Sequence, residues 1–147
     1  MCAGAPMDGR MSTYFSLPLR VYYEDTDSGG VVYYANYLKF MERARTEWLR
    51  SFGLEQDELS RRDGILFVVR SARVEYLKPA RFNDSLEVSV MLGRRGPASM
   101  VFQQEVRRSD EILCSGEIKI ACLDAAAFSP VPMPEYIVSR IHSRSTS

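Results

Sequence analysis

A change of periodicity along the chain limits its possible folds more than any other feature. The apolar residues Tyr37, Phe40, Met41, Ala44 and Trp48 recur at the spacing of one helix face. In the second half of the chain, apolar and polar residues alternate instead, as they do in strands with one buried face. One long helix followed by consecutive strands predicts an α+β fold, in which a mostly antiparallel sheet covers the apolar face of the helix.

Glycines, prolines and polar runs set the expected boundaries of these elements. The long helix is expected from about Ala35 to Ser51, and a second, short helix from Gln56 to Arg62. A turn is predicted over Arg94–Ser99 and a hairpin tip over Ser109–Asp110. About five strands are expected, over Leu17–Tyr23, Ile65–Tyr76, Leu86–Leu92, Met100–Arg107 and Ile112–Cys122.

The length of the chain predicts one domain. Its 147 residues are expected to form a single unit over residues 15–140, between a flexible tail at 1–14 and a polar tail at 141–147. Apolar residues on both faces of the strands, among them Val69 and Leu113, need a second covering surface. They therefore favour a dimer or a higher oligomer.

Charge and cysteine content argue against several classes of protein. Lys plus Arg and Asp plus Glu both number 19, so the formal net charge is zero and provides no basic field for nucleic acid. No apolar run approaches the ~18 residues of a membrane span. Three scattered cysteines without a CxxC pair predict neither a disulfide framework nor a zinc site, and they favour a reducing, cytoplasmic setting.

The histidine content narrows the chemistry further. The only histidine is His142, in the polar C-terminal segment. Ser-His-Asp and Cys-His sites need a histidine base held inside a pocket, and a histidine in a solvated tail does not meet that need. Acid–base catalysis by this chain is therefore expected to use carboxylates, tyrosine or lysine.

The segment from Glu24 to Asn36 is the strongest candidate for a site. Acidic residues, among them Asp27, meet two glycines just before the long helix begins. Glycines let a ligand approach the backbone, and the helix N-terminus offers unpaired N–H groups with a partial positive charge. A carboxylate beside such donors can attack or activate water while the donors hold oxyanion charge. The same acids also fit a simple helix-capping role.

Two metal or protease interpretations of this segment are weaker. A calcium-binding EF-hand loop needs a glutamate at its twelfth position, and counting from Asp25 that position is Asn36. Asp27-Ser28-Gly29 is similar to the active-site triplet of dimeric aspartic proteases, but a long helix follows here where those proteins are all-β. Two pairs of basic residues, Arg94-Arg95 and Lys78 with Arg81, fit either phosphate binding or solvated turn charges.

Two long stretches make the chain similar to a known family. They read RVYYEDTDSGGVVYYANYLKFMERARTEWLR (Arg20–Arg50) and FVVRSARVEYLKPARFNDSLEV (Phe67–Val88), and the likeness extends from about Leu17 to Leu123. Both resemble the Tol–Pal-associated acyl-CoA thioesterases, which belong with 4-hydroxybenzoyl-CoA thioesterase in the hotdog-fold superfamily. The resemblance implies a single hotdog domain, in which an antiparallel sheet wraps one central helix, and hydrolysis of acyl-CoA to free acid and CoA.

The resemblance also implies partners and an assembly. Acyl-CoA is the substrate, no metal or separate cofactor is needed, and acyl carrier protein is a further partner that the family's links suggest. Related proteins build the pocket across a dimer interface, so a homodimer or homotetramer is expected.

Residue roles follow from the same resemblance. Asp27 matches the catalytic carboxylate, as nucleophile or as general base, and the backbone N–H of Tyr34 matches the group that polarises the thioester carbonyl. Gly30 and Tyr33 are expected beside them, on the substrate-binding side. Arg94-Arg95 matches, more weakly, a basic pair that contacts CoA phosphate.

One departure from the family pattern leaves a second function open. Close bacterial members usually carry histidine where this chain has Tyr34, and a phenol is a poor base at neutral pH. The backbone donor at that position survives the change. The alternative is an acyl-CoA or acyl-carrier-protein binding module with little turnover. Such a module would have no need for a carboxylate at Asp27 beside the thioester.

Overall fold

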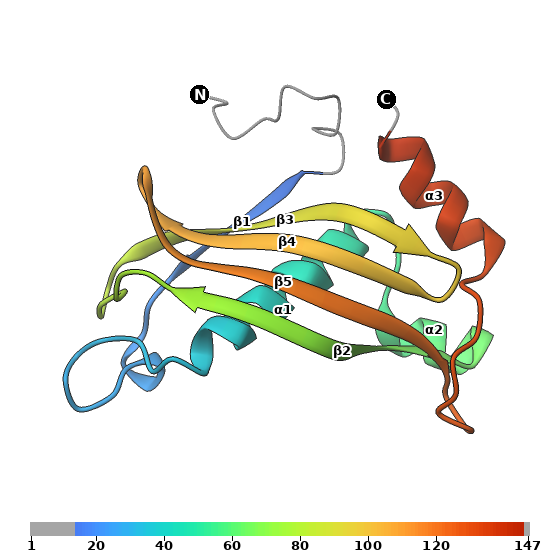
Figure 1. Ribbon diagram of the computed structural model, residues 1–147, viewed down its shortest axis with the longest axis horizontal. Coiled ribbons are helices and arrows are strands. Elements are labelled where there is room, and N and C mark those ends of the chain that lie inside the picture. The colour runs from blue at the N-terminus through green and yellow to red at the C-terminus, as the bar shows by residue number, and fades with distance from the viewer. Residues whose placement is uncertain (1–13, 146–147) are drawn as a thin grey trace.

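The computed structural model describes residues 14–145, and its strands form one five-stranded sheet (Figure 1). The strand order is β1-β3-β4-β5-β2, and every neighbouring pair is antiparallel. This confirms the predicted α+β class and the hotdog architecture. The elements are β1 (Phe15–Arg20), a 3-10 turn (Tyr23–Asp25), α1 (Asn36–Arg50), α2 (Gln56–Asp63), β2 (Ile65–Tyr76), β3 (Ser85–Gly96), β4 (Ser99–Arg108), β5 (Glu111–Asp124) and α3 (Glu135–Ser145).

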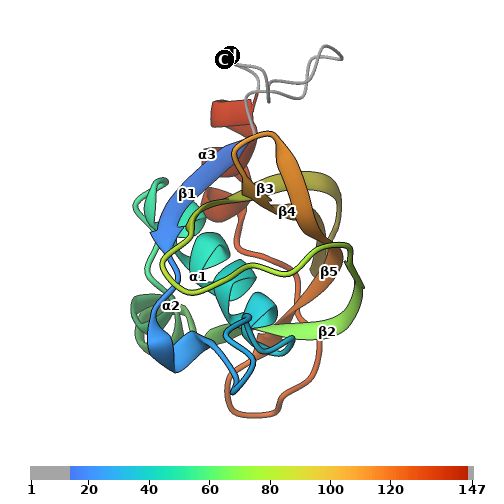
Figure 2. The ribbon, with the colours of Figure 1, turned by 90° about the vertical axis from the view of Figure 1, so that its left-hand side faces the viewer.

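The sheet curls around α1, as the end view in Figure 2 shows. All five residues of the predicted helix face are buried. The Trp48 ring packs edge-on to Phe102 of β4 at a centroid distance of 5.1 Å. Truncating an aromatic residue in such a core costs about 3–5 kcal/mol. The long-helix prediction is confirmed to within a residue at each end because the apolar stripe determines which residues are covered.

Two of the predicted strand ends are wrong. β1 stops at Arg20 rather than Tyr23, since residues 23–25 turn into a 3-10 helix. β3 continues to Gly96, so Arg94 and Arg95 lie in a strand and not in the predicted turn over Arg94–Ser99. Pairing of Arg94 with Val101 extends the β3–β4 hairpin almost to its tip. Backbone hydrogen bonds of the hairpin override the local turn signal of the Gly-Pro pair.

The C-terminal boundary also differs from the prediction. α3 continues to Ser145. Ile141, the first residue of the predicted polar tail, is only 2% exposed. Ile137 and Ile141 lie four residues apart on one buried face of α3, so the domain extends past residue 140. Of the predicted N-terminal tail, residues 1–13 lie outside the described part of the chain.

The two residues that predicted an outer apolar surface differ in burial. Leu113 is fully buried within the chain, whereas Val69 of β2 is 52% exposed. Exposed apolar side chains on β2 and just after it also include Tyr76 and Leu77. Among residues 14–145, no helix combines the length and the hydropathy needed to cross a membrane.

Candidate active site

Asp27 lies in a tight hairpin, the Asp27 loop (residues 26–35), that leads into α1. The Asp27 N–H donates to the Val31 carbonyl at 2.9 Å, and the Gly30 N–H donates back to the Asp27 carbonyl at 3.0 Å. Gly30 has a φ of +80°, a left-handed backbone conformation that residues other than glycine seldom adopt. One carboxylate oxygen of Asp27, Oδ1, accepts the Gly29 N–H at 2.9 Å. The carboxylate is therefore held at its base but exposed at its end.

The start of α1, which follows the Asp27 loop, presents unpaired donors. Within the described residues, the N–H groups of Tyr34 and Ala35 have no protein acceptor. No side chain caps the helix, and its first turn contains no acid. The side chain of Asn36 instead donates to the Asp25 carbonyl at 2.8 Å. The positive end of the helix dipole is thus left to act on a ligand.

Hairpin pairing keeps the carboxylate and the donors on adjacent arms of the loop. Thr26 forms a bridge with Val32, and the Tyr33 N–H donates to the Asp25 carbonyl at 3.0 Å. A second segment, residues 77–84, supports the loop from outside. Its Ala80 carbonyl accepts the Val32 N–H at 2.8 Å. The predicted residues Asp27, Gly30, Tyr33 and Tyr34 are therefore brought together in one loop.

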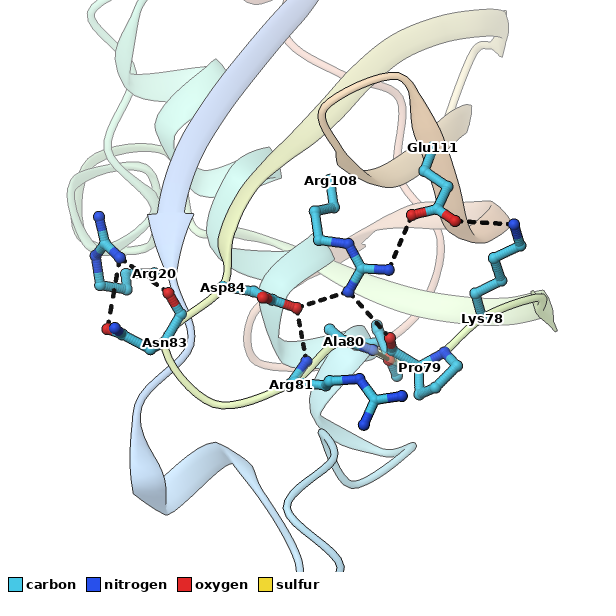
Figure 3. Close-up of polar contacts among 10 residues, drawn as sticks. Arg20, Lys78, Pro79, Ala80, Arg81, Asn83, Asp84, Arg108 and Glu111 are labelled. Atoms are coloured by element: carbon cyan, nitrogen blue, oxygen red, sulfur yellow. Dashed lines mark hydrogen bonds and ion pairs between the residues drawn. The ribbon is translucent and has the colours of Figure 1, made fainter.

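An ion cluster anchors the 77–84 segment to the hairpin between β4 and β5 (Figure 3). Arg108 donates to Asp84 at 2.7 Å and to Glu111 at 2.8 Å, and Lys78 also donates to Glu111 at 2.8 Å. Asp84 accepts the Arg81 backbone N–H at 2.8 Å as well. Hydrogen bonds from Lys78 and Arg108 lower the pKa of Glu111. Lys78 is thus engaged within the protein, which favours a structural role over the phosphate-binding interpretation.

Aromatic rings line the route from the Asp27 loop to the end of β2. The Tyr34 ring is 60% exposed and meets Tyr76 edge-on at a centroid distance of 6.0 Å. Tyr37 lies 5.5 Å from Tyr76, and its hydroxyl accepts the Ala80 N–H at 2.9 Å. Burial raises the pKa of both Tyr37 and Tyr76. Tyr33 is exposed, and a hydrogen bond with the Tyr34 side chain raises its pKa.

Comparison with known proteins decides the family. Residues 29–115 match the model of the thioesterase superfamily. The chain belongs to the thioesterase superfamily. It is 40% identical over 128 residues to the acyl-CoA thioesterase YbgC of Haemophilus influenzae, which covers 87% of this chain and 94% of that protein. It is 42% identical over 129 residues to the acyl-CoA thioester hydrolase YbgC of Escherichia coli, covering 87% and 96% of the two chains.

A solved structure agrees with this assignment. The crystal structure of a probable thioesterase from Bartonella henselae superimposes with a TM-score of 0.79 at 31% identity, over 82% of this chain and 99% of that one. The thioesterase family expected from the resemblance is thereby confirmed. An association with the Tol–Pal system stays a prediction.

The basic pair predicted to bind CoA phosphate is not near Asp27 of the same thioesterase chain. Arg94 and Arg95 lie at the far end of β3 from the 77–84 segment that supports the Asp27 loop (Figure 1). Arg94 lies nine residue steps along the strand from Ser85, which is about 30 Å. Adjacent strand residues point to opposite faces, so the two arginines do not form one fork. Arg94 also lies 3.6 Å from Glu117.

Other groups of this thioesterase offer no competing chemistry in the described residues. Cys114 and Cys122 are buried, and burial raises the pKa of the Cys114 thiol to about 12. His142 lies exposed on α3 rather than in an irregular tail. Between residues 14 and 145, no cluster of three or more histidine, cysteine or acidic side chains could hold a metal ion.

Proposed function

We propose that this chain hydrolyses acyl-CoA thioesters to a free acid and CoA through the Asp27 loop. The observation that carries the proposal is the exposed Asp27 carboxylate in the same short loop as the unpaired N–H groups of Tyr34 and Ala35. Relatives more than a third identical over most of the chain bear the name acyl-CoA thioesterase, which supports the same substrate class.

The chemistry follows from the charges at the loop. The thioester oxygen accepts the Tyr34 N–H, so negative charge that develops on this oxygen meets a donor at the positive end of α1. Asp27 then acts in one of two ways. It attacks the carbonyl carbon, expelling CoA thiolate and leaving a mixed anhydride that water opens, or it takes a proton from the water that attacks. Either path consumes one water and releases one acid and one CoA.

The working form is proposed to be a dimer that pairs β2 with β2. β2 is a 12-residue strand at the edge of the sheet, so one row of its backbone N–H and C=O groups has no strand partner. Long exposed edges of this kind pair readily with a second strand. Antiparallel pairing about the middle of β2 sets the Tyr76 end of one strand beside the Ile65 end of the other. The Asp27 loop, which adjoins Tyr76, then faces the partner's other half.

This assembly also gives the basic pair a role. By register, Arg94 and Arg95 lie level with Ser71 and Val69, near the middle of β2. In a dimer paired about the middle of β2, the two arginines therefore lie level with the two-fold axis. Contact with the CoA phosphates of a substrate bound at the partner's loop is the role we assign to them.

The test replaces Asp27 with asparagine, which keeps the shape and removes the charge. Free-thiol release is measured on short, long and aromatic acyl-CoAs, with the exposed Asp57→Asn on α2 as a matched control. The Asp27→Asn variant is expected to lose at least a hundredfold in kcat, about 3 kcal/mol of barrier, while the control keeps its activity. A wild type that binds acyl-CoA without releasing thiol would instead establish the binding-module alternative.

A further inference from the structure

A cavity of about 180 Å³ opens between the second half of α1 and the first half of β2. Its walls include Trp48 and Leu49 of α1, Phe67 and Val68 of β2, and Phe102 of β4. The cavity is not part of the Asp27 loop of the same chain. Arg45 at the cavity wall lies nine residue steps beyond Asn36, where α1 begins. This separation is about 14 Å along the helix axis.

Arg45 is the unusual member of this wall. Only 9% of the residue is exposed, and its guanidinium forms no ion pair with an acid in the described part of the chain. It makes one hydrogen bond, from Nη1 to Gln104 Oε1 at 2.8 Å. Gln104 is itself held by donation to the Met41 carbonyl at 3.1 Å and the Ser89 carbonyl at 3.2 Å.

The remaining N–H groups of Arg45 open onto the cavity. An arginine has five N–H donors, and only Nη1 has a protein acceptor here. Among the described residues, no fully buried side-chain nitrogen or oxygen lacks a partner, so the other guanidinium nitrogens reach open space. The cavity that Arg45 lines supplies that space.

A buried cation without an anion is costly, and the cost is offset when an anion binds. Desolvation lowers the pKa of Arg45 to about 10, so the guanidinium stays charged at neutral pH. Glu42 is the only other ionisable residue on the cavity wall, and it is exposed to solvent. The acidic charge is therefore screened by water, while the basic charge is buried beside apolar rings.

We propose that this cavity receives the acyl group of a substrate bound at the partner's Asp27 loop, and that Arg45 selects acyl groups whose far end carries a carboxylate. The inference rests on the proposed thioesterase function and on the β2–β2 dimer. A cavity of about 150 Å³ accommodates benzene, so this one suits a chain of about five carbons or a single ring. Arg45 is thus a specificity residue, because it touches the acyl end and not the thioester.

The test compares three acyl-CoAs of equal length, namely pentanoyl-CoA, 5-hydroxypentanoyl-CoA and glutaryl-CoA, by thiol release. Wild type is expected to prefer glutaryl-CoA in kcat/KM by at least tenfold over pentanoyl-CoA. Arg45→Met should reduce that ratio by about tenfold to a hundredfold, the loss of a charge-assisted hydrogen bond. Glu42→Gln should raise the ratio, because it removes the acidic charge from the cavity wall. A purely structural role of Arg45 would not predict that increase.

Controls separate selectivity from folding and from the proposed function. Arg45→Lys keeps the charge and should retain part of the preference, and the exposed Arg43→Met on the same helix should retain all of it. Equal wild-type rates on pentanoyl-CoA and glutaryl-CoA, or a preference for the hydroxyl compound alone, would overturn the carboxylate assignment even if Arg45→Met did not fold. Absence of thiol release from every acyl-CoA would instead refute the underlying function, and thiol release that survives Asp27→Asn would refute the role of Asp27.

Discussion

Replacing Gly30 with alanine tests whether the Asp27 loop is held by its backbone conformation. Gly30 has a φ of +80°, and a Cβ built on it meets no atom within 4 Å. The substitution therefore adds conformational strain without a clash. Gly64, which ends α2, has a φ of +65° and equally open surroundings, far from the loop in sequence, so Gly64→Ala is a matched control.

The two variants are expected to lose the same stability. Holding a non-glycine residue in the left-handed region costs about 1–2 kcal/mol. Alanine recovers about 0.4–1 kcal/mol by restricting the unfolded chain. The net loss is about 1 kcal/mol in the free energy of unfolding for each variant. Denaturant titration at one fixed protein concentration measures it, with the fluorescence of the buried Trp48, the chain's only tryptophan, as the probe.

Activity is expected to separate the two variants. Strain at Gly30 is relieved by a backbone shift. The Gly30 N–H donates a hydrogen bond to the Asp27 carbonyl, so the shift moves Asp27 as well. A displacement of about 1 Å at a catalytic group costs up to a hundredfold in rate, so Gly30→Ala should lose at least tenfold in kcat. Gly64→Ala should stay within twofold of wild type. Equal kcat values for the two variants, at equal loss of stability, would refute the idea that this loop positions the carboxylate.

Two further predictions follow from burial and charge. Because burial raises the pKa of Cys114 from 9.0 to about 12, its thiolate fraction near pH 8 falls about a thousandfold. In a Cys2→Ser background, an aromatic disulfide should therefore label Cys114 and Cys122 slowly in the native protein and rapidly in denaturant; fast native labelling would contradict their burial. Lys78 and Arg108 lower the pKa of Glu111 below 4.5, so its stabilising contribution is present above about pH 4.5 and is lost as pH falls through the folded pKa. The melting-temperature difference between wild type and Glu111→Gln should shrink below that pH, and a difference constant across pH would argue against the ion cluster.

The helix and the strands could be predicted because each carries its own period. Five apolar residues of α1 alone determine which face is buried, and the alternation in β5 does the same for the sheet. The wrong boundaries lie where long-range pairing decides instead. The end of β3 is extended by its bonds to β4, and α3 is stabilised by burying Ile137 and Ile141 in a core that local sequence does not reveal.

The candidate site was predictable only in part, for a related reason. The acid- and glycine-rich loop before a helix start marked the segment that holds Asp27, and the family resemblance implied the roles of Asp27, Gly30 and Tyr34. Tyr76 and Arg108 reach the site from distant strands. Arg45 shows no local signal either. The helical pattern alone does not reveal that this arginine is buried without an acidic partner. Such residues become visible only when the contacts of the folded chain are known.

The position of β2 connects these separate features. Its C-terminal end carries Tyr76 beside the Asp27 loop, and its N-terminal half lines the Arg45 cavity. Within one chain, about 14 Å along the axis of α1 separates its start at the Asp27 loop from Arg45, too far for a short acyl group to reach both. In the proposed dimer, antiparallel pairing of two β2 strands would bring each loop beside the other chain's cavity and form two equivalent sites at once. Turnover is then expected to depend on dimer formation, since the carboxylate and the pocket of a single chain lie too far apart to act on one short acyl group.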